Sequence, residues 1–181
     1  MPIDDPDNRA PIHTRSIVCN GYRRDDGLWD IEAHLTDTKA YAVHNDFRSV
    51  PAGAPFHSMT LRITVDDTLT IHAIKACIDA APHRICPAIV PNLQCLVGLQ
   101  IGPGFNAELR RRLGGELGCT HLVELFSPLA TTAIQTVLPL RRATSGGTPA
   151  HLKPIGGCHA LAANGALVAR YWSQPPLPAV A

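Results

Sequence analysis

The segment 21–39 is the part of the sequence richest in side chains that can carry charge or move a proton. These side chains alternate along two expected strands: Tyr22 and Arg24 on the first, then Asp30, Glu32 and His34 on the second. Residues two apart on a strand share a face of the sheet. If the two faces coincide, a phenol, a guanidinium, an imidazole and two carboxylates converge in a polar pocket. The alternative is a solvated sheet face with cross-strand ion pairs, each worth under about 1 kcal/mol.

Two histidines outside this segment are placed for proton transfer. His57 begins a later strand, where it overhangs a pocket or stands as an ordinary surface side chain. His121 lies three residues before Glu124 in the clearest expected helix, so the two side chains are neighbours on its surface. A carboxylate beside an imidazole orients the ring and raises its basicity. With three lysines against nine histidines, histidine is the main candidate for proton chemistry near neutral pH.

The cysteines offer a competing chemistry, that of a metal or iron–sulfur site. Such a site would be built from Cys119, His121, His57 and Cys158. No two of the six cysteines form a Cys-x-x-Cys pair, however, and no spacing is diagnostic of a metal. Gly-x-Gly-x-x-Gly, Walker and Gly-x-Ser-x-Gly motifs do not occur either. We therefore expect neither a metal nor a cofactor, and keep the Cys/His site as the alternative.

Strands in the first half of the chain and helices in the second must position these side chains. Apolar and polar residues alternate with period two in the segments 15–24, 28–41, 59–65 and 69–77. Helical spacing follows in 88–99, 105–113 and 120–138, the last ended by Pro139. We expect a loop over 42–55 and a closing hairpin over 158–172. This order predicts an α+β fold, an antiparallel meander sheet with C-terminal helices packed on one face.

Length and charge limit the classes of protein that fit. The 181 residues predict a flexible lead over 1–12, a single α+β domain over 13–172 and a Pro-rich tail over 173–181. A formal charge of +1 argues against a nucleic-acid partner. No apolar run approaches the ~20 residues of a membrane span, and the acidic, Pro-rich start does not look like a signal peptide. We therefore expect a cytoplasmic protein without a membrane partner; homo-oligomerisation is left open.

Four stretches of sequence carry a resemblance to a known family. GYRRDDGLWDIEAHLTDTK, GAPFHSMTLRITVD, GCTHLVELFSPLATTAIQT and the later GCHAL resemble the bacterial family called domain of unknown function 2889. The resemblance runs from about Ile12 to Ala160. The family pattern places its recurrent polar residues at His13, Arg15, Tyr22, Arg24, Asp26, Asp30, Glu32, Asp37, His57, His121, Glu124 and His159. Where the pattern has a large aromatic residue after His-x-Met, this chain has Thr60, which changes the shape of any pocket.

The resemblance also implies a class of reaction. Such proteins are associated with aromatic catabolism in sphingomonad-type bacteria, where cofactor-free lyases release formaldehyde from lignin-derived diaryl compounds. Loss of a hydroxymethyl group as formaldehyde needs a base for the alcohol proton and an electron sink, which a para-phenol supplies as a quinone methide. We therefore expect a cofactor-independent carbon–carbon lyase with a phenolic aromatic substrate. A non-catalytic small-molecule or protein binding module is the other alternative.

In the lyase hypothesis each polar residue takes a role. The acid–base residues are His57, His121, Glu124 and Glu32. The substrate-binding residues are Tyr22, Arg24, Asp30 and His34. Tyr22 and Arg24 would hold the phenolate oxygen by hydrogen bond and charge, while Glu32 would position Arg24 or exchange a proton.

Overall fold

The computed structural model describes residues 8–145 and 155–172. The chain divides into two compact units, Met1–Gly146 and Gly147–Ala181, which are described separately. The division falls inside the expected domain 13–172. The expected tail 173–181 and most of the expected lead 1–12 lie outside the described residues.

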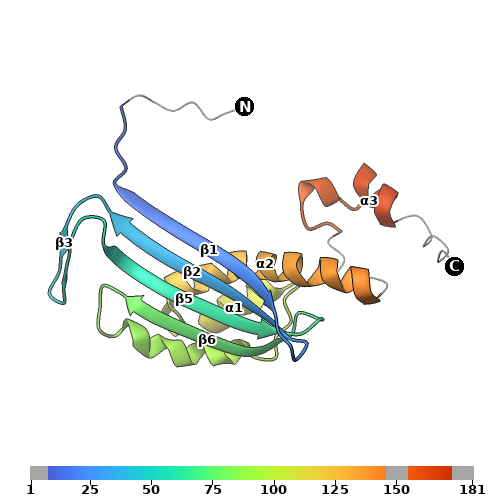
Figure 1. Ribbon diagram of the computed structural model, residues 1–181, viewed down its shortest axis with the longest axis horizontal. Coiled ribbons are helices and arrows are strands. Elements are labelled where there is room, and N and C mark those ends of the chain that lie inside the picture. Colours follow the sequence, from blue (N-terminus) through green and yellow to red (C-terminus); the bar gives the residue numbers. More distant parts are fainter. Residues whose placement is uncertain (1–7, 146–154, 173–181) are drawn as a thin grey trace. The chain divides into compact units, whose positions relative to one another are not determined.

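A four-stranded antiparallel sheet forms the first unit, in the order β1–β2–β5–β6 (Figure 1). Its strands are β1 (His13–Arg23), β2 (Trp29–Lys39), β5 (Pro55–Val65) and β6 (Ile71–Ala80). The β1–β2 turn closes with the Arg24 N–H donating to the Leu28 carbonyl, and Gly27 adopts a φ of +84° that favours glycine. The predicted α+β class and antiparallel meander are confirmed.

The sheet has a buried inner face and a polar outer face because apolar and polar residues alternate along its strands. On β2 the inner positions are Trp29, Ile31, Ala33, Leu35 and Asp37, all at most 3% exposed. β5 continues this core with Met59, Leu61 and Ile63. The row of apolar side chains on β2 therefore ends in a buried carboxylate.

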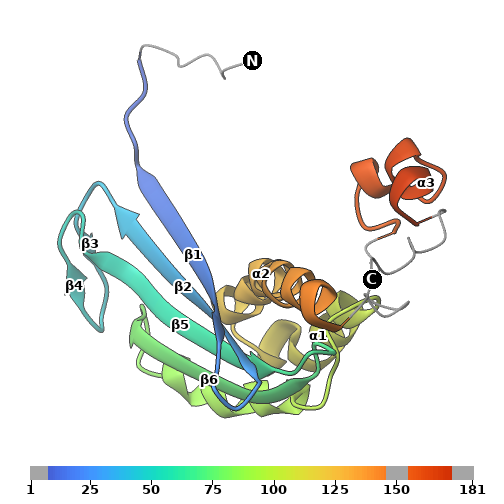
Figure 2. The ribbon, with the colours of Figure 1, turned by 45° about the vertical axis from the view of Figure 1, so that its right-hand side comes forward.

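Within the first unit, the described helices lie on the inner face of the sheet (Figures 1 and 2). They are η1 (Cys86–Leu96), α1 (Phe105–Leu113), η2 (Gly115–Leu117) and α2 (Thr120–Ser145). The longest, α2, lies against β1 and β2 and buries Leu122, Phe126, Leu129, Ala133 and Val137 at helical spacing. At Gly21 of β1, an added Cβ would lie 2.1 Å from Thr136 Oγ1, so only glycine permits this approach.

Two helices depart from the sequence prediction. α2 does not end at Pro139 but continues to Ser145, although an interior proline removes one backbone hydrogen bond and crowds the carbonyl four residues earlier. Arg141 supplies an anchor by donating to the Asp67 carbonyl at 2.6 Å. The predicted helix 88–99 is instead the 3-10 helix η1, which contains Pro91. Its buried residues, Leu93 and Leu96, are three apart, which is the 3-10 period.

The segments expected as a loop and as a closing hairpin also differ. Within 42–55 a short hairpin forms from β3 (Val43–His44) and β4 (Ser49–Val50). The predicted hairpin over 158–172 is wrong, since the second unit contains η4 (His159–Leu161) and α3 (Ala166–Trp172). Its Asn-Gly pair precedes α3, and the Gly165 carbonyl accepts the Ala169 N–H, so the glycine begins a helix. Among the described helices, none has the length and apolar character needed to cross a bilayer.

Candidate active site

Three strands place three polar side chains in one row at the end of the inner face. In the pairing register, Arg15 of β1 lies opposite Asp37 of β2, and Asp37 lies opposite His57 of β5. Directly paired residues project from the same face of a sheet. The pairing of β2 with β5 shifts immediately after Asp37, so an irregularity borders the row. Bulges of this kind often redirect side chains next to active sites.

Asp37 is the centre of this row and is completely buried. Arg15 donates to both of its oxygens, from Nε to Oδ1 and from Nη2 to Oδ2, at 2.8 Å each. His13 Nε2 lies 3.2 Å from Oδ1. Burial alone would raise the pKa of Asp37, but the Arg15 guanidinium and the hydrogen bond to His57 outweigh burial and lower the pKa to about 2. Asp37 is therefore a permanent, shielded negative charge near neutral pH.

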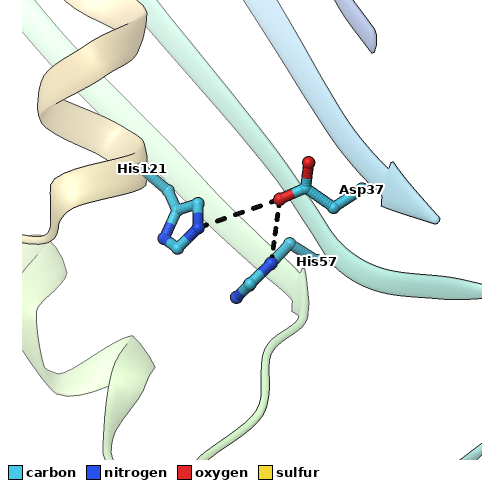
Figure 3. Close-up of side chains that lie close together, drawn as sticks. All are labelled: Asp37, His57 and His121. Atoms are coloured by element: carbon cyan, nitrogen blue, oxygen red, sulfur yellow. Dashed lines mark hydrogen bonds and ion pairs between the residues drawn. The ribbon is translucent and has the colours of Figure 1, made fainter. Parts of the chain in front are cut away.

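His57 is held by this carboxylate (Figure 3). Its Nδ1 lies 2.9 Å from Asp37 Oδ2, so Nδ1 carries the proton and Nε2 is left as the basic nitrogen. Burial and the nearby His121 ring lower the pKa of His57 below its ordinary value of 6.5, against the opposing effect of Asp37. The ring is therefore neutral at pH 7 with an unprotonated Nε2, as a general base requires.

The first turn of α2 brings two more side chains to the row. The His121 ring lies 3.9 Å from the His57 ring between centroids, and its Nε2 lies 3.8 Å from Asp37 Oδ2 (Figure 3). Burial and the Arg15 charge lower the pKa of His121. Glu124 pairs with Arg15 Nη1, so one guanidinium bridges two carboxylates. The sheet and the helix together thus enclose two neutral imidazoles.

An accessible cation and two aromatic rings lie along the edge of this site. The Lys39 ammonium is 3.5 Å from His13 Nδ1 and 5.7 Å from the ring centroids of both Tyr41 and Phe56. The Phe56 ring meets the His57 ring edge-on at 4.9 Å between centroids. A cation beside aromatic rings suits an aromatic ligand that carries negative charge.

The structure brings only some of the sequence-predicted site residues together. His57 and His121 lie beside Asp37, and Glu124 joins them through Arg15, whereas the other five project elsewhere. Glu32 and His34 lie on the outer face of β2, where Glu32 accepts from Arg62 Nε at 2.6 Å and His34 lies 3.0 Å from Thr60 Oγ1. Tyr22 pairs in register with Asp30 on that face, near the turn where Arg24 pairs with Asp26 at 2.7 Å. The two clusters do not converge, because the sheet lies between them.

The catalytic and binding roles predicted from the sequence do not include Asp37 or Arg15. Both residues appear there only among the recurrent polar positions of the family pattern. A signal for Asp37 is nevertheless present in the sequence. Asp37 lies two residues after Leu35 and so continues the inward-facing series of β2, where its charged side chain is forced into the core. Such a carboxylate requires partners, so it predicts a functional or paired site at that end of the strand.

The same side chains could also hold a metal ion. Asp37, His57 and His121 each offer one ligand atom, and these atoms lie within 4.8 Å of one another. A carboxylate with two neutral imidazoles suits Zn²⁺ or Fe²⁺. Within the described parts of the chain, no cysteine belongs to this group, and all six cysteines are free thiols. This set therefore differs from the cysteine-containing one considered from the sequence.

The fold and the site define an α+β protein in which a sheet and the start of a helix place Arg15 beside a buried Asp37–His57 pair. Residues 13–135 match the family model described as protein of unknown function (DUF2889), about two thirds of the chain. The chain therefore belongs to that family, and the matched range contains every residue of the site. No curated protein and no solved structure matches the chain.

Proposed function

We propose that this protein is an enzyme that uses general acid–base catalysis, with His57 as the base. The observation that carries the proposal is the 2.9 Å contact between His57 Nδ1 and the buried Asp37 carboxylate. A carboxylate in this position fixes the imidazole tautomer and stabilises the imidazolium that forms when Nε2 takes a proton. A positioned acid–base group of this kind supplies about 10²–10⁴-fold in rate.

The reaction that we propose is a cofactor-independent loss of formaldehyde from a phenolic diaryl compound in the cytoplasm. The phenol first expels a benzylic hydroxide, which leaves as water and produces a quinone methide. His57 Nε2 then takes the hydroxymethyl O–H proton. The carbon–carbon bond breaks, its electron pair restores the phenol, and formaldehyde leaves together with a stilbene. No oxidant or reductant is consumed.

Neighbouring side chains support these steps. His121, whose ring lies 3.9 Å from the His57 ring between centroids, can take up the proton that the phenol releases and pass it to the leaving hydroxide as an imidazolium. The Lys39 ammonium can stabilise a phenolate oxygen, with Tyr41 and Phe56 beside the aromatic ring. Arg15 positions Asp37 and Glu124. The proposal gives Tyr22, Arg24, Asp30, Glu32 and His34 no part at this site, because they belong to the outer cluster.

The test is a turnover assay on the chelator-treated protein with a panel of phenolic diarylpropane diols. Formaldehyde and the absorbance of a stilbene are followed, and metal content is checked by elemental analysis. We expect product at an undiminished rate, loss of turnover in His57→Gln, and retained turnover in the matched outer-face variant His34→Gln. Equal rates in His57→Gln and the unsubstituted protein would exclude His57 as the base.

A metal-dependent enzyme is the second candidate, carried by the convergence of Asp37, His57 and His121. These residues would hold the ion, which would act as a Lewis acid or activate water. A metal would compete with the Arg15 and His57 hydrogen bonds that already occupy both Asp37 oxygens. Stoichiometric metal in the purified protein, with activity lost on chelation and restored by the ion, would establish this candidate over the first.

A further inference from the structure

A concave site separate from the Asp37 row lies between the β3–β4 hairpin and the end of β6 with the residues that follow it. Its volume is about 360 Å³, within the range of small-molecule pockets. Phe47 and Arg48 of the hairpin form one side, and Ile78, Ala81 and Arg84 form the other. Asn45 ties the two sides together, because its Nδ2 donates to the Pro82 carbonyl at 3.1 Å.

The charge of this cavity favours an anion. Arg48 and Arg84 contribute two guanidinium groups and His83 an imidazole, against the single carboxylate of Asp79. The Arg84 guanidinium stands over the Phe47 ring at 5.0 Å from the centroid. A guanidinium stacked on an exposed ring keeps its N–H groups free to form the paired hydrogen bonds that a planar carboxylate accepts.

Arg48 provides a second, independent observation. Its Nη2 donates to the Pro55 carbonyl at 2.6 Å, but its Nε–H is buried and has no hydrogen-bond partner. An unpaired buried donor is costly, and this one belongs to a side chain that lines the cavity. The apolar side chains of Ile78 and Ala81 complete the lining, so the ligand needs an apolar body as well as a charge.

We propose that this cavity binds a small carboxylate with an aromatic or aliphatic body, at a site separate from His57. The carboxylate pairs with Arg84 and Arg48, and the body lies against Phe47 and Ile78. A planar carboxylate fits better than a phosphate, because the lining combines fork-shaped donors with apolar walls and one opposing carboxylate. The site does not depend on the proposed reaction, since none of its residues belongs to the Asp37 row.

The test is a binding titration with benzoate, followed by amide chemical shifts in NMR spectra. We expect saturable shifts at Phe47, Ile78 and Ala81. Benzamide, the neutral analogue, and inorganic phosphate should each bind at least about tenfold more weakly, because one lacks the charge and the other the apolar body. Equal binding of benzamide or phosphate would overturn the assigned ligand class.

Two substitutions test whether benzoate binds in this cavity. Arg84→Gln should weaken benzoate binding by about tenfold, the loss expected for a charge-assisted hydrogen-bonded pair. Arg62→Gln is the matched control on the outer face and should bind benzoate as the unsubstituted protein does. An unchanged affinity in Arg84→Gln, shifts confined to His57 and His121, or no saturable shift at all would each refute the proposal. The readout is binding alone, so a failed formaldehyde assay leaves this result unaffected.

Discussion

Arg15 and Asp37 face each other across β1 and β2 in direct register, and the guanidinium contacts both carboxylate oxygens at 2.8 Å. This bidentate pairing allows a fully buried carboxylate to stay ionised. It also leaves the Asp37 charge available to orient His57 from the opposite strand. The pair thus links the stability of the sheet edge to the chemistry of the site.

Removing the Asp37 charge should destabilise the protein. In Asp37→Asn the partly exposed Arg15 guanidinium loses its counter-charge, and breaking a fully buried pair costs about 3–5 kcal/mol. Because Arg15 is 31% exposed, we expect the lower end, about 3 kcal/mol, measured by urea denaturation. Glu32→Gln, which breaks the outer-face pair with Arg62, should cost less than about 1 kcal/mol. Equal losses of unfolding free energy in Asp37→Asn and Glu32→Gln would contradict a larger contribution from the Arg15–Asp37 pair.

Replacing either inner-face histidine should reduce turnover without unfolding the protein. We expect His57→Gln to lower kcat by about 10²–10⁴-fold, the contribution of a positioned acid–base group. His121→Gln should lower kcat less if it only relays a proton. Circular dichroism and thermal unfolding check that the fold is intact, and a loss of kcat that merely follows a loss of folded protein would assign both histidines a structural role.

Activity should rise with pH through a midpoint below 6.5. The pKa of His57 is lowered below 6.5 by burial and by His121, so its basic form predominates at neutral pH. A kcat/KM profile measured across the acidic range up to neutral pH, with the folded state checked by circular dichroism at each point, tests this expectation. A midpoint above 6.5 would show that the base is a different group or that His57 is solvated.

Stability should depend on pH in the same direction. The unfolded chain takes up protons near pH 6.5, whereas folded His57 and His121, with their lowered pKa values, stay neutral to lower pH. Their contribution is therefore complete above pH 6.5 and is lost as the pH falls through the folded pKa values. Asp37, lowered from 3.8 to about 2, loses its own contribution at still lower pH. Midpoints of urea denaturation, measured as the pH is lowered from neutral, test the pH dependence from the two histidines and that from Asp37.

The outer-face residues provide the sharpest test of which cluster is catalytic. Glu32 pairs with Arg62 across β2 and β5, on the face opposite His57. We expect Glu32→Gln to retain the kcat and KM of the unsubstituted protein in the formaldehyde assay. A large loss of kcat with an intact fold would transfer the proposed chemistry to the outer face.

The four long strands of the sheet could be predicted because alternation of apolar and polar residues depends only on local spacing. The α1 helix was predicted at its observed bounds, Phe105–Leu113, since glycine follows it directly. The end of α2 could not be predicted, because the contact of Arg141 with the Asp67 carbonyl joins residues far apart in the chain. The Asn-Gly pair before α3 is a hairpin signal that helix-forming residues after it override.

The site was less predictable than the fold for a related reason. Sequence spacing shows that Glu32 and His34 share a face of β2, but not which face the helices cover. Only the strand register places Arg15, Asp37 and His57 in one row. His121 and Glu124 could be paired from helical spacing, yet Glu124 pairs with Arg15, which precedes it by 109 residues.

Because the row spans β1, β2 and β5, the site forms only when these three strands pair in their native register. A slip of one residue between two strands would turn Asp37 toward solvent and separate it from Arg15. A partly paired sheet therefore leaves His57 hydrated and without its carboxylate partner. In a stopped-flow refolding experiment, the imidazole would acquire its native titration only when the three strands have paired and α2 has brought His121 beside it, so proton release reports the completion of the site.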